Sequence, residues 1–215
     1  MPNHNFALPV WIDLAATFLF GLTGALAAMK RGHDWIGVFA LAFATAVGGG
    51  LIRDGIFISQ GPPAVTKDSR YIIAVTVAAA TAPLLRLPTI RFNRLIAWLD
   101  ALGLGAYAVV GIEKSLGAGL SVAAAILVGV INAIGGSVLR DVLVREEPLL
   151  FKPGQFYTLA ALAGCLLFVL LTLRLQMEVM PAALISIGST FAFRVLAIRF
   201  NWKTRPVLEE NERGA

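Results

Sequence analysis

A short glycine-rich element occurs twice in this chain, and its two copies belong to a repeat that covers most of the sequence. AVGGGLIRD (46–54) matches AIGGSVLRD (133–141), and WIDLAATFLFGLTG (11–24) matches WLDALGLGAYAVVG (98–111). Both matches have the same offset of 87 residues (133 − 46 = 87 and 98 − 11 = 87). Self-similarity at one fixed period predicts a fold built from two copies of one unit. The identical pairs include Trp11/Trp98, Asp13/Asp100, Gly24/Gly111, Gly32/Gly119, Ala46/Ala133, Gly48/Gly135, Gly49/Gly136, Arg53/Arg140 and Asp54/Asp141.

Long apolar segments place both copies in a membrane. The mean hydropathy of the 215 residues is +0.78, with 58% hydrophobic and 14% charged residues, which excludes an ordinary soluble domain. A membrane-spanning helix needs about 20 predominantly apolar residues. The sequence therefore predicts an all-α membrane protein with seven spans, at about 8–29, 35–57, 69–86, 94–113, 118–143, 155–174 and 179–199.

The repeat and the spans together predict the topology of a single transmembrane domain, residues 1–200. Repeat one covers about 8–86, repeat two about 94–174, and the seventh helix, about 179–199, is an addition. Because each repeat holds three spans, an odd number, the second copy should enter the membrane from the opposite side, as inverted repeats do. Residues 201–215 form a polar tail.

The distribution of Lys and Arg predicts the orientation. The net charge of +5 is spread over short loops rather than gathered in a stripe, which argues against a nucleic-acid partner. One side of the membrane would carry only Lys67, Arg70, Lys114 and Arg174. The other, basic side is expected to be cytoplasmic, with the N-terminus outside and the tail inside a plasma (inner) membrane. Its residues are Lys30, Arg31, Arg86, Arg91, Arg94, Arg145, Lys152, Arg199, Lys203, Arg205 and Arg213.

Clustered glycines near the middle of the second and fifth spans are the candidate pore elements. Glycine favours kinks and exposes backbone carbonyls, which is tolerated at membrane depth only where backbone is packed in protein or lines a wet cavity. Two such clusters at symmetric depth, each followed by charges, favour a broken pore-lining helix over the alternative, close packing through small residues. The residues are Gly48, Gly49 and Gly50 in the first copy and Gly135, Gly136 and Ser137 in the second.

Each cluster is followed by an adjacent Arg and Asp, which are costly in lipid. Neighbouring residues point about 100° apart on a helix, so we expect each to find another partner. The equivalent depths of the repeated residues predict two structural ion pairs, Asp13–Arg53 and Asp100–Arg140. Asp54 and Asp141 would then face a water-filled path and attract cations. The alternative is that these two aspartates only cap or orient local backbone.

The remaining polar residues add little chemistry. Thr45 and Asn132 share one repeat position and would supply oxygens to a dehydrating ion or hydrogen-bond between helices. Cys165 lies in an apolar run and reads as a small buried hydrophobe. No Cys/His spacing indicates a metal, and no cofactor or catalytic motif is present, so an enzyme is not predicted.

The paired GGGLIRD and GGSVLRD elements, the seven spans and the two three-span repeats resemble the prokaryotic TRIC family, the trimeric intracellular cation channels. The resemblance covers nearly the whole chain apart from the polar tail. It implies a homotrimer with an hourglass pore in each subunit, bounded by the kinked second and fifth helices, that passes K⁺ and other monovalent cations such as Na⁺. Ser137, where the first copy has Gly50, departs from the pattern. The lysine-glutamate-valine lipid-binding element of animal relatives is not evident.

Three functions follow from these observations. The first is a monovalent cation channel. The second is a secondary transporter of a small zwitterion such as glycine, because half-helix ends near the midplane suit a carboxylate as well as a cation, and some bacterial relatives are labelled glycine transporters. The third is a structural membrane scaffold, in which replacing Asp54 or Asp141 would not change flux.

Overall fold

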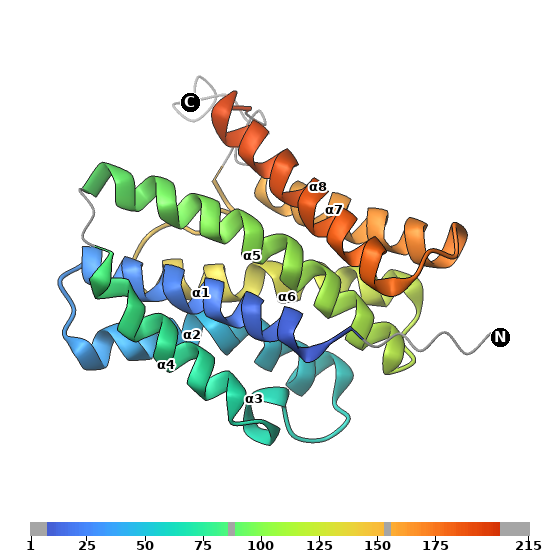
Figure 1. Cartoon of the computed structure of the whole chain (residues 1–215), viewed down its shortest axis with the longest axis horizontal. Helices are drawn as coiled ribbons and strands as arrows, with labels where there is room; N and C mark the ends of the chain where they lie inside the picture. Colours follow the sequence, from blue (N-terminus) through green and yellow to red (C-terminus); the bar gives the residue numbers. More distant parts are fainter. Residues whose placement is uncertain (1–7, 86–88, 153–155, 203–215) are drawn as a thin grey trace, which may run out of the picture.

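The computed structural model describes residues 8–85, 89–152 and 156–202, and every regular element among them is helical (Figure 1). Two of the longer helices end in a π-helical turn and one in a 3₁₀ turn. In chain order they are α1 (Val10–Lys30), α2 (Trp35–Ile52) with π-helix η1 (Arg53–Ile58), α3 (Ala64–Lys67), α4 (Arg70–Thr81) with 3₁₀ turn η2 (Ala82–Leu84), α5 (Thr89–Gly117), α6 (Val122–Leu143), α7 (Tyr157–Val169) with π-helix η3 (Leu170–Arg174), and α8 (Val179–Arg199).

Six of these helical segments are long and apolar enough to cross a membrane, so the chain is a multi-pass helical membrane protein. The third predicted span instead forms a shorter apolar helix, Arg70–Leu84, made of 12 residues of α4 and 3 of η2. At 1.5 Å per residue it reaches about 22 Å, less than the hydrocarbon core of about 30 Å. The count of seven spans is therefore not confirmed. The predicted polar tail lies outside the described residues from position 203 onward.

The helices form two groups that follow the repeat. In the first, α1, α2 and α4 pack against one another, and in the second, α5, α6 and α7 do the same. The groups meet through α1 with α5 and through α2 with α6, while α8 packs on α5 and α7. Figure 1 shows α5 running between the first group and the α7–α8 pair.

Both groups enter their second helix through the same local structure. Gly32 and Gly119, an identical pair of the repeat, both have positive φ angles of 75° and 84°, a conformation that glycine adopts without steric cost. Two residues later, Asp34 accepts a hydrogen bond from the backbone N–H of Gly37 at 2.8 Å, and Ser121 accepts one from Ala124 at 3.3 Å. These are N-caps of α2 and α6, 87 residues apart (121 − 34 = 87).

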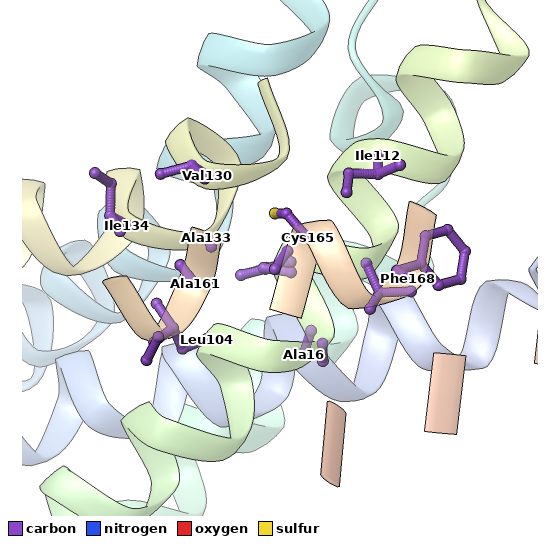
Figure 2. Packing of buried hydrophobic residues seen from close by; sticks show 14 of the residues in the cluster. Ala16, Leu104, Ile112, Val130, Ala133, Ile134, Ala161, Cys165 and Phe168 are labelled. Carbon is purple, nitrogen blue, oxygen red and sulfur yellow. The ribbon is translucent and has the colours of Figure 1, made fainter. Parts of the chain in front are cut away.

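The larger apolar core lies mainly among α5, α6 and α7, and α1 and α8 also contribute to it. Figure 2 shows Cys165 and Phe168 of α7 among the side chains of α5 and α6, with Leu104, Ile112 and Val130 nearby. Cys165 and Phe168 have no exposed surface, and Cys165 is a free thiol, which confirms the expectation of a small buried hydrophobe. In a membrane such contacts stabilise mainly through van der Waals packing, because lipid tails are as apolar as leucine.

Candidate functional site

The glycine clusters lie where α2 crosses α6. A Cβ atom added to Gly49 would collide with the backbone carbonyl of Asn132, and one added to Gly136 would collide with the carbonyl of Thr45. Gly135 also lies close to the Gly49 backbone, because a Cβ added to it would be 3.0 Å from Gly49 Cα. Because Thr45 meets Gly136 while Gly49 meets Asn132, the two equivalent helices cross antiparallel. The glycines therefore permit backbone contact that any side chain would prevent.

The expectation of a broken helix at the glycines is wrong. Helix α2 continues through Gly48, Gly49 and Gly50 to Ile52, and α6 is helical from Val122 to Leu143. Close packing, the alternative, is what the crossing shows. The departure from α-helical geometry comes after the glycines, where η1 begins at Arg53. Gly50 has room, since the nearest atom to a would-be Cβ is an Arg53 nitrogen at 3.7 Å, and its repeat equivalent is Ser137.

The two Arg-Asp elements form the charged part of the site, and each arginine pairs with the aspartate that follows it. Arg53 Nε donates to Asp54 Oδ1 at 2.7 Å, and Arg140 Nε donates to Asp141 Oδ1 at 2.9 Å. We expected these neighbours to be poor partners, and that expectation is wrong. The Cα–Cβ bonds diverge, but the long arginine side chain turns back along its own helix and reaches the neighbouring carboxylate.

Both aspartates also hold the loop that follows their helix. Asp54 Oδ2 accepts a hydrogen bond from the backbone N–H of Ala64 at 3.0 Å, and Asp141 Oδ2 accepts one from Leu149 at 3.4 Å. Neither carboxylate is the uncommitted group that the sequence predicted. Each joins an arginine to a loop, which is close to the alternative reading that the aspartates orient local backbone.

One of the two predicted ion pairs is present. Arg140 Nη1 donates to Asp100 Oδ1 at 2.9 Å, so this buried guanidinium lies between two carboxylates, Asp100 and Asp141. The same nitrogen lies 3.2 Å from Thr23 Oγ1 on α1. A buried arginine with several such partners has its charge balanced and its donors satisfied.

The other predicted pair, Asp13–Arg53, is not formed. Asp13 Oδ2 instead accepts hydrogen bonds from Lys114 Nζ and from Tyr71 OH, both at 2.6 Å. The physical reason is the length of α5, which continues to Gly117 and carries Lys114 to Asp13, whereas the sequence placed Lys114 in a loop. The repeat position equivalent to Lys114 is Ala27 (114 − 87 = 27), which carries no charge. Asp100 therefore has no lysine partner equivalent to Lys114 and pairs with Arg140.

Thr45 and Asn132 make hydrogen bonds within the protein. Thr45 Oγ1 donates to the Leu41 carbonyl of its own helix at 2.6 Å. Asn132 joins three helices, since its Oδ1 accepts from Arg53 Nη1 at 3.3 Å and its Nδ2 donates to the Tyr107 carbonyl at 2.7 Å. Both side chains are fully buried, so of the two readings the structure shows the hydrogen-bonding one.

Sequence reasoning missed the aromatic and basic side chains that complete the site. Tyr107 of α5 donates a hydrogen bond to the Ala46 carbonyl of α2. Tyr157 of α7 donates to Ser137 Oγ at 2.8 Å, and Arg194 of α8 lies over the Tyr157 ring, 5.0 Å from its centroid. These residues have no identical partner in the other repeat, so the repeat could not reveal them.

Three cavities adjoin these residues, and we name them by position. The Asp54 cavity, about 290 Å³, is lined by Asp54, Ala64, Lys67 and Lys114 among others. The narrow cavity, about 20 Å³, shares Asp54 and Ala64 with it and is also lined by Asp13, Gly50 and Tyr107. The Asp100 cavity, about 270 Å³, is lined by Asp100, Arg140, Asp141, Lys30 and Lys152 among others. Asp54 follows the C-terminal end of α2, and Asp141 lies near the C-terminal end of α6. Because these two helices run antiparallel, the Asp54 and Asp100 cavities lie at opposite ends of the helix crossing.

A family model described as Glycine transporter matches the chain in two segments, residues 10–86 and 97–172. The chain belongs to this glycine-transporter family. The two matched segments start 87 residues apart (97 − 10 = 87), which is the offset of the sequence repeat. The UPF0126 inner membrane protein YadS of Escherichia coli K12 is 32% identical over 212 residues, covering 96% of this chain and 100% of the relative. A UPF0126 membrane protein of Vibrio cholerae is 33% identical over 195 residues, covering 88% and 79%.

Solved structures extend the comparison to cation channels. The TRIC trimeric intracellular cation channel orthologue from Rhodobacter sphaeroides has a TM-score of 0.82 and 32% identity, covering 89% of this chain and 97% of that chain. A second structure, reported for conductance through TRIC cation channels, has a TM-score of 0.78 and 29% identity, covering 95% and 99%. This member of the glycine-transporter family therefore has a TRIC-like fold, and the recognition from the doubled glycine element is confirmed.

Proposed function

We propose that this protein is a monovalent cation channel with one conduction path in each subunit, running past the α2–α6 crossing. The observation that carries the proposal is the pair of cavities at opposite ends of that crossing, each lined by the aspartate of one Arg-Asp element, Asp54 or Asp141. The likeness to channels of known structure over nearly their full length supports it. In this view the two repeats are inverted, each contributing one half of the path.

The charge arrangement argues for weak selectivity among monovalent cations. Asp54 is paired with Arg53, Asp13 with Lys114, and Asp141 with Arg140, so most carboxylates at the path have a basic partner within 2.9 Å. Paired charges produce a weak, dipolar field at a distance, unlike a ring of unpaired carboxylates. K⁺ is the proposed main ion, and Na⁺ should also pass.

The assembly and the orientation are part of the same proposal. We infer a homotrimer from the names of the structural relatives, with the path inside each subunit rather than between subunits. The loop charges support an N-terminus outside and a C-terminus in the cytoplasm of the inner membrane. In a Cys165→Ser background, a cysteine at Gly214 should resist a membrane-impermeant maleimide in intact cells, and rapid labelling there would reverse the orientation.

The second candidate is a carrier for a small zwitterion, and the description of the family model favours it. The Asp100 cavity has both charge signs, with Lys30 and Lys152 as well as Asp100 and Asp141, as a zwitterion would require. Glycine is small enough for a cavity of about 270 Å³.

Recording from the purified protein in planar bilayers separates the two functions. A channel should show unitary current steps in symmetric KCl, and the current should reverse near the K⁺ potential in a KCl gradient. A carrier should show no steps but saturable, glycine-dependent uptake in proteoliposomes. Uptake without unitary currents would replace the channel proposal with the carrier. If the protein shows neither unitary currents nor glycine uptake, the third function, a structural membrane scaffold, is the one that remains.

A further inference from the structure

Tyr107 lines the smallest of the three cavities along the proposed path. It lines the narrow cavity, whose volume of about 20 Å³ is small beside the two large cavities and is room for about one water molecule. The Tyr107 side chain comes from α5, in the second group of helices, and its hydroxyl reaches the Ala46 carbonyl on α2, in the first group. The residue is 2% exposed. It therefore bridges the two groups of helices beside the smallest of these cavities.

Three further contacts hold this residue in place. Its ring packs on Phe20 of α1, with ring centroids 4.9 Å apart. Its hydroxyl oxygen lies 3.0 Å from Thr17 Oγ1, whose own proton goes to the Asp13 carbonyl at 2.8 Å. Its backbone carbonyl accepts a hydrogen bond from the side-chain amide of Asn132 on α6. The phenol is thus held by α1 and α2, and the backbone that carries it by α6.

The Ala46 carbonyl lies at the narrow cavity, which Ala46 and Gly50 both line. In an α-helix the carbonyl of residue 46 points toward the N–H of residue 50, and its second lone pair accepts the Tyr107 hydroxyl. A backbone carbonyl oxygen that borders a cavity is the kind of group that replaces the water of a permeating cation.

We propose that Tyr107 is the gate of the conduction path: its hydroxyl occupies the Ala46 carbonyl in the closed state and releases it to the permeating cation in the open state. The inference rests on the proposed channel function. On α5, Tyr107 lies between Asp100 and Lys114, so in this proposal the phenol blocks the Asp100 side of the narrow cavity, while Asp54 and Ala64 line both the narrow cavity and the Asp54 cavity. Opening requires the phenol to turn away from Ala46. The Ala46 carbonyl oxygen then coordinates the permeating cation in place of the hydrogen bond from Tyr107.

The first test removes only the hydroxyl. Tyr107→Phe keeps the ring against Phe20, and the loss of one net hydrogen bond should raise the ratio of open to closed channel about fivefold to tenfold. Thr172→Val is the control, because Thr172 is equally buried and donates one hydrogen bond, to the Phe168 carbonyl at 2.7 Å, yet lines none of the three cavities. Open probability in planar bilayers should rise in Tyr107→Phe and stay unchanged in Thr172→Val.

A second test does not depend on current. In a Cys165→Ser background, Val47→Cys places a thiol at the narrow cavity, which Val47 lines. Ag⁺ is a small thiophilic cation, and its reaction with this thiol can be followed by mass spectrometry in right-side-out and inside-out vesicles. Tyr107→Phe should accelerate the reaction at least fivefold from the Asp100 side and leave it unchanged from the Asp54 side.

These tests separate the inference from the proposed function. If the wild-type protein shows no unitary currents, the channel function falls, yet faster Ag⁺ access from one side still supports the gate. If the wild-type protein conducts but Tyr107→Phe changes neither open probability nor Ag⁺ access, Tyr107 is not the gate. Equal acceleration from both sides would also overturn it, because the side chain would then only stiffen the bundle.

Discussion

Lys114 Nζ lies 2.6 Å from Asp13 Oδ2, an ion pair that ties the last turn of α5 to the first turn of α1. Tyr71 of α4 donates to the same carboxylate oxygen, and the Lys114 ammonium lies 5.9 Å from the centre of the Tyr71 ring. One aspartate therefore joins three helices from both groups beside the narrow cavity. This contact replaces the Asp13–Arg53 pair that the repeat predicted.

A double-mutant cycle distinguishes the two pairings of Asp13. Asp13→Asn and Lys114→Met should show a coupling of about 0.5–1.5 kcal/mol, toward the lower end of the range for contacting charges because the Lys114 side chain is 29% exposed. Asp13→Asn with Arg53→Met should be additive within about 0.5 kcal/mol. Thermal unfolding in detergent measures both cycles. Stronger coupling to Arg53 than to Lys114 would contradict the structure.

Breaking the buried Asp100–Arg140 pair should destabilise the protein more than breaking the Asp13–Lys114 pair. Asp100→Asn leaves Arg140, which is 4% exposed, with only Asp141 as a charged partner and should destabilise the fold by about 3–5 kcal/mol. The double variant Asp100→Asn with Arg140→Met removes the stranded charge and should recover part of this loss. The Trp98→Phe variant of the same helix, which leaves both charges in place, serves as the control. A double variant less stable than the sum of the single changes would exclude a stabilising pair.

Alanine substitutions test the helix crossing. Gly49→Ala and Gly136→Ala each place a methyl group against the backbone of the other helix, so each should destabilise the protein by several kcal/mol or prevent folding. Gly50→Ala is the control on the same helix, because its Cβ has room, and helix propensity predicts a gain of up to about 1 kcal/mol. Melting temperatures decide the matter. Three equal effects would mean that the crossing is not as close as described.

Replacing Asp54 should lower K⁺ conductance because it leaves the charge of Arg53 unbalanced. Asp54→Asn removes the partner of a guanidinium whose residue is only 1% exposed, so an unbalanced positive charge is left beside the narrow cavity. K⁺ conductance should fall strongly in low salt and less in high salt, because the Debye length shortens from about 30 Å at 0.01 M to about 3 Å at 1 M. Arg53→Gln added to Asp54→Asn should restore part of the current. Equal losses at every salt concentration would indicate a purely structural role through the bond to Ala64.

The sequence and the structure agree where a residue's role depends on its own segment. The helices were located to within a few residues, although the third is too short to count as a span. The N-caps and positive-φ glycines recur at the repeat offset, since helix ends are decided by local chemistry. The Asp100–Arg140 pair was also predicted. The adjacent Arg-Asp pairs were not, because the positions of Cα atoms on a helix do not show how far an arginine side chain can turn.

The amino-acid sequence by itself determined that the chain is a helical membrane protein built from two related units with buried charges, because hydropathy and repetition act along the chain. The tertiary structure alone decided which groups meet. Asp13 binds Lys114 and Tyr71, and the Tyr107 hydroxyl donates to the Ala46 carbonyl. Gly49 and Gly136 allow close contact between antiparallel helices rather than forming kinks. The physical reason is that these contacts join residues 58 to 101 positions apart. Their partners are selected by helix length and crossing geometry, which no local pattern encodes.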